Sequence, residues 1–181
     1  MTDKAALRQA ALAARDRAHA TVPPDHAAHL LAALAPHLGR PLAGYSPIRT
    51  EIDPSPAMAH AAGAGPVALP VVTGRGMPLR FRRWHPDAVM TDGPFGARIP
   101  AEGDWIDPEI LIVPLVAFDR RLNRLGYGGG FYDRTLEGLR AARPTIAIGF
   151  AHSAQELPEI PVEPTDQPLD LVVTEREIIA R

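Results

Sequence analysis

Apolar residues follow two different spacings along this chain, and the two spacings alternate. Several short runs, such as ILIV at 110–113, are apolar without interruption, which is typical of strands buried on both faces. Segments between several of these runs place apolar residues three or four positions apart, as on one face of a helix. Strands that alternate with helices favour a mostly parallel sheet flanked by helices. The sequence therefore predicts an α/β fold, and residues 1–181 are expected to form a single domain.

The helical spacing occurs in four places. Helices are predicted at residues 3–20, 25–39 and 56–63 and directly after the glycine-rich turn at 126–130. Thr2 or Asp3 can cap the first helix, and Pro23-Pro24 separates it from the second. Lys4, Arg8 and Arg15 lie on or near one side of this first helix, away from its apolar stripe.

The continuous and partly alternating apolar runs predict the strands. These strands are expected at residues 41–48, 66–72, 79–84, 110–113, 145–150 and 169–175. Residues 86–107 are predicted to be a loop-rich section without regular structure. The loop after the first strand carries the charged residues Arg49, Glu51 and Asp53.

Composition excludes several classes of function. The chain has 181 residues, 46% of them hydrophobic and 22% charged, which is typical of a soluble globular protein. A net charge of -2 provides no global field for nucleic acid, so an anionic ligand must meet local clusters of Lys and Arg. The absence of cysteine excludes disulfides and thiolate chemistry. Without a signal-like or membrane-spanning run, we expect a cytoplasmic protein that binds neither nucleic acid nor membrane.

The glycine-rich turn is the strongest candidate for chemistry. Arg124-Leu125-Gly126-Tyr127-Gly128-Gly129-Gly130-Phe131-Tyr132-Asp133 joins a buried strand to a predicted helix. It fails the dinucleotide-binding fingerprint, because Phe131 stands three residues after Gly128, and it lacks the Gly-Lys-Ser/Thr end of a P-loop. Free amides at a helix start beside Arg124 would suit an anion such as phosphate. A tight turn that needs glycines only for its backbone angles explains the pattern equally well.

Residues 112–136 closely resemble the signature of the 5-formyltetrahydrofolate cyclo-ligases, also called 5,10-methenyltetrahydrofolate synthetases. The resemblance is carried by Pro114-Leu115-Val116-Ala117-Phe118-Asp119 and by the stretch from Arg124 to Leu136. It continues at Lys4-x-x-x-Arg8 and Glu51 near the N-terminus and at Leu169-Asp170 in the closing segment. The resemblance implies a Rossmann-like, three-layer fold for the whole chain.

The resemblance also implies a reaction. ATP and 5-formyltetrahydrofolate would give ADP, phosphate and 5,10-methenyltetrahydrofolate, with Mg²⁺ as the metal cofactor. The protein is expected to act as a monomer. A formamide oxygen is a poor leaving group, so its phosphorylation by ATP would allow attack by N10 and departure of phosphate. Such phosphoryl transfer depends mainly on positioning and charge neutralisation.

Particular residues receive roles from the same resemblance. ATP would be held by Lys4, Arg8, Arg124, Leu125, Gly126, Tyr127, Gly128, Gly129, Gly130, Phe131 and Tyr132. Ser46, Glu51, Tyr127 and Tyr132 would contact the folate, and Asp133 and Asp170 would hold Mg²⁺. Glu51, Arg124 and Asp133 would be the catalytic residues, with Glu51 accepting a proton as the ring closes.

Each of these roles has a structural alternative. Asp133 could favour the helix dipole alone, and Asp170 could hydrogen-bond a neighbouring loop. Lys4 and Arg8 could form an ordinary solvated helix face. For the whole chain, the alternative function is a nucleotide-binding module on the same scaffold without cyclo-ligase activity, because one fold hosts many functions.

Overall fold

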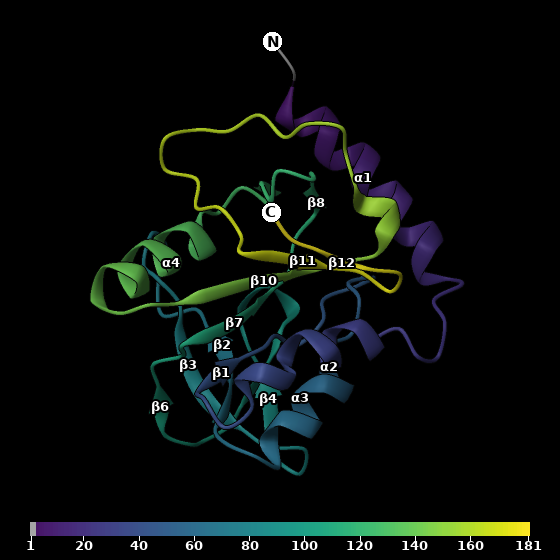
Figure 1. The fold of residues 1–181 in the computed structure, drawn as a ribbon. Helices are drawn as coiled ribbons and strands as arrows, with labels where there is room; N and C mark the ends of the chain where they lie inside the picture. The colour runs from purple at the N-terminus through teal and green to yellow at the C-terminus, as the bar shows by residue number, and fades with distance from the viewer. Residues whose placement is uncertain (1–2) are drawn as a thin grey trace.

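The computed structural model describes residues 3–181, and a mostly parallel sheet lies at its centre (Figure 1). The described residues form one eight-stranded sheet of order β12-β11-β10-β7-β1-β2-β3-β6. Its strands are β1 (Leu42–Ala43), β2 (Val67–Val71), β3 (Arg80–Trp84), β6 (Trp105–Ile106), β7 (Ile110–Val113), β10 (Ile146–Phe150), β11 (Leu171–Val173) and β12 (Ile178–Ile179). The five strands from β11 to β2 are parallel, and β12, β3 and β6 are added antiparallel. The predicted fold class is confirmed.

Helices cover both faces of this sheet (Figure 1). Leu42 of β1 packs into a core with α2 (Ala28–Leu34) and α3 (Ser55–Ala62), whereas the next residue, Ala43, packs into a second core with α4 (Phe131–Ala142). This alternation of side chains between two apolar layers explains why the central strands are apolar at every position. All four residues of β7 are buried.

The first helix, α1 (Lys4–His19), lies outside these two layers. Its Ala11 packs with Val116, Ala117 and Leu125 in a third, smaller core. Val116 precedes β8 (Ala117–Phe118), which forms an antiparallel hairpin with β9 (Arg124–Leu125). The hairpin ends directly before the glycine-rich turn, so α1 packs beside the start of that turn.

The helix boundaries differ slightly from those predicted. Asp3 caps α1 by accepting a hydrogen bond from the backbone N–H of Ala5, and Thr2 lies outside the described residues. The second helix begins at Ala28 instead of Asp25, because residues 24–27 form a turn. Both ring nitrogens of His26 lie within hydrogen-bond distance of backbone carbonyls, which fixes this turn against the loop before α3.

The section at 86–107 contains more structure than the prediction of a loop. Met90–Asp92 (β4) pairs with Arg98–Pro100 (β5) around a 3-10 turn at Pro94–Gly96, and β6 follows. These strands are short and half exposed, so they lack the apolar pattern that marks a buried strand. Two further 3-10 turns occupy Ala35–His37 and Ser153–Gln155.

The order of the strands predicts where a ligand can bind. The chain goes from β1 to β2 on one side and later returns to β7 on the other side of β1. Loops that leave the carboxyl ends of β1 and β7 therefore diverge, and such a switch point is the usual ligand-binding crevice of a parallel sheet. The loop after β1 carries Glu51, and the chain after β7 leads to the glycine-rich turn.

No helix among residues 3–181 is long and apolar enough to cross a membrane.

Candidate functional site

Glu51 is a buried carboxylate in the loop that follows β1. Its side chain belongs to a residue only 5% exposed, and Oε2 accepts a hydrogen bond of 2.8 Å from the backbone N–H of Ile48. Oε1 accepts a hydrogen bond of 3.1 Å from the hydroxyl of Tyr127 in the glycine-rich turn. Burial raises the pKa of Glu51, while these two hydrogen bonds and the charge of Arg15 oppose the rise. A buried carboxyl group with a raised pKa is suited to proton transfer.

The glycine-rich turn has backbone angles that favour glycine. Gly128 has a φ of 103° and Gly130, the N-cap of α4, a φ of 68°, both in the left-handed region. A Cβ on Gly130 would lie 2.7 Å from Nη1 of Arg134, whose Nη2 donates to the carbonyl of Gly129. The alternative of a turn that needs its glycines for conformation is thus partly true.

The same turn leaves its amides free and surrounds them with cations. Within the described chain, the backbone N–H groups of residues 127–130 have no hydrogen-bond acceptor in the protein. Nε of Arg8 donates to the carbonyl of Gly126 at 2.7 Å, and the Arg8 guanidinium approaches the Cβ position of Gly128 to 3.5 Å. Free N–H groups at the start of a helix, beside arginines, form an anion-binding geometry.

A chain of hydrogen bonds connects α1, the glycine-rich turn and the loop after β1. Arg15, only 1% exposed, donates through Nη1 to the hydroxyl of Tyr127 at 2.6 Å and through Nε to Thr50 at 3.0 Å. Tyr127 in turn donates to Glu51. Three segments that are far apart in sequence therefore meet at one carboxylate.

All three tyrosines of the chain surround Glu51. Burial raises the pKa values of Tyr45, Tyr127 and Tyr132, and the negative charge of Glu51 raises each of them further. The buried hydroxyl of Tyr132 has no hydrogen-bond partner within the described residues. A buried hydroxyl without a partner costs free energy, so this oxygen is available to a ligand.

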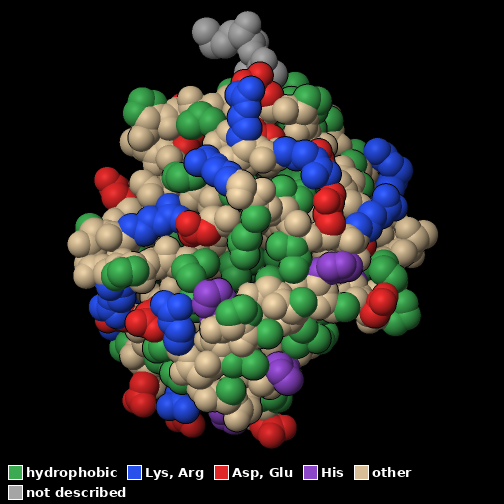
Figure 2. All heavy atoms as spheres, in the orientation of Figure 1, with side chains coloured by type: hydrophobic (Ala, Val, Ile, Leu, Met, Phe, Trp, Pro, Cys, Tyr) green, Lys and Arg blue, Asp and Glu red, His purple; other side chains and the backbone are tan. Residues whose placement is uncertain are grey.

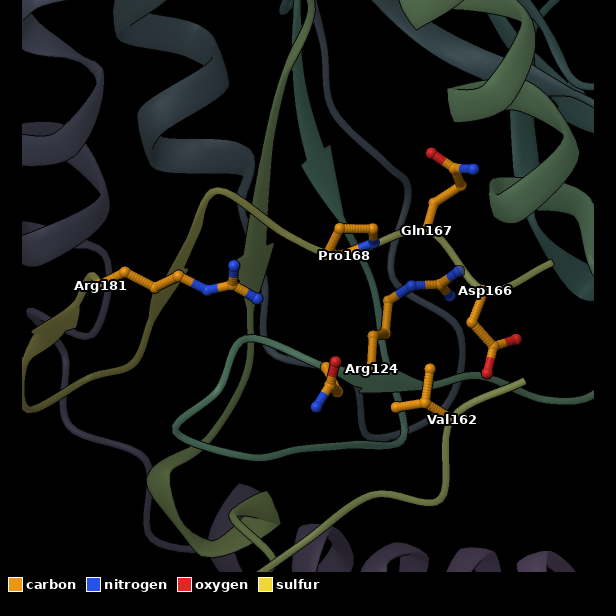
Figure 3. A pocket seen from close by; sticks show the side chains of 7 residues that line it. Arg124, Val162, Asp166, Gln167, Pro168 and Arg181 are labelled. Carbon is orange, nitrogen blue, oxygen red and sulfur yellow. The ribbon is translucent and has the colours of Figure 1, made fainter. Parts of the chain in front are cut away.

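Arg124 and Asp133 form an ion pair at the first turn of α4. Nη2 of Arg124 lies 3.0 Å from Oδ1 of Asp133, which also accepts from the backbone N–H of Gln167 at 2.9 Å. Beside Arg124 lies a hollow of about 200 Å³, bordered by the segment that carries Asp166 and Gln167. Figure 3 shows Arg124 extending toward this segment. A larger hollow of about 580 Å³ lies beside the last turns of α1, and no residue of the predicted site lines it.

Lys4, predicted to bind ATP, and Asp170, predicted to bind Mg²⁺, both form ion pairs within the protein. Nζ of Lys4 pairs with Glu163 at 3.1 Å and Asp166 at 3.6 Å, so its contact with a phosphate stays a prediction that requires Lys4 to leave these carboxylates. Asp170 precedes β11 and accepts from the backbone N–H of Ala147, at the amino ends of the strands. It also pairs with Arg140, which lies two turns along α4 from Asp133, about 10 Å away.

The structure therefore does not bring Asp133 and Asp170 together as joint metal ligands. The contacts of Asp170 are those of its structural alternative, because a residue before a parallel strand begins lies at the edge of the sheet opposite to the switch point. The expected pairing came from the family resemblance, and a motif in the sequence does not show at which end of a strand Asp170 lies. Ser46, by contrast, lies in the loop after β1, half-buried and five residues before Glu51.

Sequence reasoning missed one exposed aromatic residue near the turn. Phe95 is 73% exposed and has a left-handed φ of 63° in the 3-10 turn between β4 and β5. Its ring centroid lies 6.1 Å from that of Phe131, the first residue of α4. A bulky residue in this backbone conformation is unusual and often marks a functional position. The only signal in the sequence was a phenylalanine between two turn-forming residues, Pro94 and Gly96.

Three arginines lie next to the glycine-rich turn, although the net charge of the chain is small. On the face shown in Figure 2, Lys and Arg side chains lie across the upper part and at the lower left of the molecule, with Asp and Glu among them. The positive groups next to the glycine-rich turn, Arg8, Arg124 and Arg134, each contact the turn or the first turn of α4. An anion at the turn would thus meet a local positive field.

Comparison with known proteins gives this geometry a context. The model of the 5-formyltetrahydrofolate cyclo-ligase family matches residues 1–175. The chain belongs to this family. The 5-formyltetrahydrofolate cyclo-ligase of Haemophilus influenzae is 41% identical over 101 residues, covering 52% of this chain and 54% of that protein. That of Mycolicibacterium smegmatis is 36% identical over 122 residues, covering 64% and 61%. The chain thus spans about half the length of the curated relatives that it matches.

Solved structures of the cyclo-ligase family match over nearly the full chain. The structure of Aquifex aeolicus 5,10-methenyltetrahydrofolate synthetase has a TM-score of 0.77 at 28% identity, covering 98% of this chain and 92% of that one. The Mycoplasma pneumoniae 5,10-methenyltetrahydrofolate synthetase has a TM-score of 0.70 at 24% identity and supports the fold alone. The resemblance stated from the sequence is confirmed.

Proposed function

We propose that this member of the cyclo-ligase family converts 5-formyltetrahydrofolate to 5,10-methenyltetrahydrofolate and couples the conversion to cleavage of ATP into ADP and phosphate. The observation that carries the proposal is the hydrogen bond between Tyr127 and Glu51. It joins a turn with anion-binding geometry to a buried base, so a triphosphate and a folate could meet there. Family membership and the likeness to the Aquifex aeolicus synthetase support the same reaction.

The triphosphate would bind at the glycine-rich turn. The free amides of residues 127–130 point to a site at the start of a twelve-residue helix, α4, whose dipole favours negative charge. Arg8 and Arg134 hold the carbonyls of this turn, which keeps their guanidinium groups close to it. Leu125, which is buried, and Arg124 fix the strand from which the turn departs.

The proposed chemistry has two steps. The formyl oxygen attacks the γ-phosphorus, the bond to the β-phosphate oxygen breaks and ADP leaves. N10 then attacks the activated formyl carbon, the carbon–oxygen bond to phosphate breaks, and N10 loses its proton. Glu51 would accept that proton, because it is buried, it is held by two hydrogen bonds and its pKa is raised toward the working range of a base.

The folate would lie between the loop after β1 and the first turn of α4. Ser46, Tyr127 and Tyr132 are the proposed contacts, and the hydroxyl of Tyr132 still lacks a partner among the described residues. Tyr127 is 49% exposed, so its ring can also contact a bound pterin.

Mg²⁺ fits this site through Asp133. Oδ1 of Asp133 is occupied by Arg124 and Gln167, while Oδ2 has no hydrogen-bond partner within residues 3–181. Within the same residues, no cluster of three or more acidic, histidine or cysteine side chains could hold a metal ion. Mg²⁺ usually takes one or two carboxylates and completes its shell with phosphate oxygens and water. When bound, the ion would neutralise charge on the phosphates.

The test is a direct assay of the reaction. Purified protein is mixed with MgATP and 5-formyltetrahydrofolate, and the near-ultraviolet absorbance of the methenyl product is followed together with ADP release. We expect one ADP for each methenyl product and no product when ATP is omitted. A folded protein that binds ATP without forming product would instead be a nucleotide-binding module.

The predictions of a monomer and of a cytoplasmic location can be checked by sedimentation velocity and cell fractionation.

A further inference from the structure

Arg15 is a fully buried arginine without an acidic partner of its own. It is 1% exposed, and none of the ion pairs among the described residues includes it. Burying a guanidinium group without a carboxylate is costly, so a chain tolerates it only where hydrogen bonds compensate. Its neighbour on α1, Arg17, is exposed and lies near the larger hollow. The two arginines thus share a helix but have opposite environments.

The contact between Arg15 and Tyr127 determines the direction of the next hydrogen bond. Arginine has only donors, so the oxygen of Tyr127 must accept from Nη1 of Arg15 at 2.6 Å. A tyrosine hydroxyl has a single hydrogen, and this hydrogen is then left for Oε1 of Glu51. Arg15 also donates to Thr50, the residue that precedes Glu51. One buried side chain, Arg15, therefore holds both the residue before Glu51 in the sequence, Thr50, and the hydroxyl that donates to Glu51, that of Tyr127.

The charge of Arg15 acts on Glu51 as well. The groups that face Glu51 are the hydroxyls of Tyr45, Tyr127 and Tyr132 and the charges of Arg15 and of Arg124 beyond Tyr132, with Asp53 in the same loop. Burial raises the pKa of Glu51 and favours the neutral acid, while the hydrogen bonds from Ile48 and Tyr127, and after them the positive charge of Arg15, lower this pKa. A carboxyl group must be ionised before it can accept the N10 proton.

We propose that Arg15 is a positioning residue that acts through Tyr127: it aims the Tyr127 hydroxyl at Glu51 and keeps Glu51 ionised for the ring closure. This inference rests on the proposed function, because Glu51 matters as a base only if the chain catalyses that reaction. Arg15 itself touches neither the turn's amides nor the proposed place of the reacting atoms.

The experiment compares Arg15→Gln and Arg15→Lys with the matched control Arg17→Gln. The first readout is the pH dependence of kcat/KM, and the second is the ¹³C NMR titration of the Glu51 carboxyl, assigned with Glu51→Gln. Arg15→Gln should move the acidic limb of kcat/KM and the NMR midpoint upward by about one pH unit, so turnover well below the limb falls about tenfold. Arg15→Lys keeps the positive charge, so its NMR midpoint should lie close to that of the wild type. The control Arg17→Gln should have the same midpoint and the same pH dependence of kcat/KM as the wild type.

Two results would overturn the proposal. The first is a fall of kcat/KM by the same factor at every pH with an unchanged NMR midpoint, which would mean that Arg15 only supports the fold. The second is an equal shift in Arg17→Gln, which would reflect general charge. If Arg15→Gln does not fold, Tyr127→Phe removes the half-exposed hydroxyl instead and should shift the midpoint in the same direction. Wild-type protein without any cyclisation activity would refute the proposed function, whereas the NMR titration would still test the coupling.

Discussion

At the scale of single residues, Glu51 combines a proposed catalytic role with a cost to stability. Its pKa is raised by burial in the folded state, so the native protein resists its ionisation. The neutral Glu51 contributes fully to the free energy of unfolding at a pH below its pKa in the unfolded chain. This contribution is lost as the pH rises through its pKa in the folded protein. As the pH rises above the unfolded pKa, the burial of this carboxyl group therefore weakens the fold.

Glu51→Gln is expected to gain stability and lose activity. The melting temperature should rise relative to wild type at pH 8, and the gain should shrink toward pH 4, where the wild-type residue is protonated. The loss of the base should lower kcat about 100-fold. Thermal melts at both pH values, with the cyclisation assay, check this. A variant that is less stable at pH 8 would contradict the assignment of a raised pKa.

Arg8 and Lys4 differ in ways that their spacing does not reveal. Arg8 contacts the glycine-rich turn, whereas Lys4, one helical turn away, pairs with Glu163 and Asp166. Arg8→Ala should raise the KM for ATP about tenfold, which corresponds to the loss of one charge-assisted hydrogen bond. Lys4→Ala should have a smaller effect. Steady-state kinetics with each substrate varied checks both, and an equal increase of both KM values in Arg8→Ala would indicate a purely structural helix.

The residues of the candidate site were predictable where their chemistry lies in the backbone or in a long motif. Gly126–Gly130, Arg124 and Glu51 could be named from the sequence. Arg15 was visible only as a third basic residue near one side of α1, because nothing in a helical pattern shows that a charged residue is buried. Its partners, Thr50 and Tyr127, are 35 and 112 residues away, so the contact depends on tertiary structure.

At the scale of secondary-structure elements, α4 offers a matched pair of glycines. Gly130 caps the helix with a left-handed φ and a Cβ there would lie 2.7 Å from Arg134, whereas Gly138 is exposed within the helix and no atom lies within 4 Å of its Cβ position. Gly130→Ala should destabilise the protein by about 1 kcal/mol and raise the KM for ATP. Gly138→Ala should stabilise it by about 0.5–1 kcal/mol with unchanged kinetics. Denaturant unfolding and ATP kinetics check the pair.

The two ends of α4 also separate the aspartates. Asp170→Ala leaves the buried N–H of Ala147 without its acceptor and should cost about 1–2 kcal/mol of stability at nearly normal turnover. Asp133→Asn should keep the fold but lower Mg²⁺-dependent turnover roughly tenfold or more. Unfolding curves and Mg²⁺ titrations of activity check the contrast. Near-normal turnover in Asp133→Asn would remove this residue from the proposed metal site.

Long elements with a strong pattern could be predicted, and short ones could not. The helix at 3–20 and the strand at 110–113 appear as α1 and β7 with almost the same bounds. β8 and β9 have two residues each and are defined by pairing between residues 117–118 and 124–125. A two-residue strand carries too little pattern to be recognised, because two positions show neither an alternation nor a continuous apolar run, even where the partner strand lies close in sequence.

At the scale of the whole molecule, the order of the strands decides which loops meet. β1 has only two residues, yet it lies between β2 and β7 and thereby forms the switch point. The alternation of strands and helices predicted a parallel sheet but not this order, because an apolar strand sequence does not specify which strand lies next to it. The encounter of Glu51 with Tyr127 follows from that order.

Ligand binding at the turn should therefore reach the loop after β1. MgATP alone is expected to slow hydrogen exchange at residues 126–131 and, through Tyr127, at residues 48–51. In Tyr127→Phe the first effect should persist and the second should disappear, because the hydrogen bond to Glu51 is absent. Exchange mass spectrometry checks this, with β10 as an internal reference that should not change. Slowing at 48–51 in both proteins would mean that ATP acts on this loop by another route.

The placement of the tyrosines has a practical consequence. Tyr45, Tyr127 and Tyr132 are the only tyrosines in the sequence, and the charge of Glu51 raises the pKa of each. Biosynthetic incorporation of fluorotyrosine would therefore yield three ¹⁹F resonances, each from a ring that is influenced by the same carboxylate. Such a spectrum would report on this corner of the protein without background from elsewhere, and would follow each ligand as it arrives.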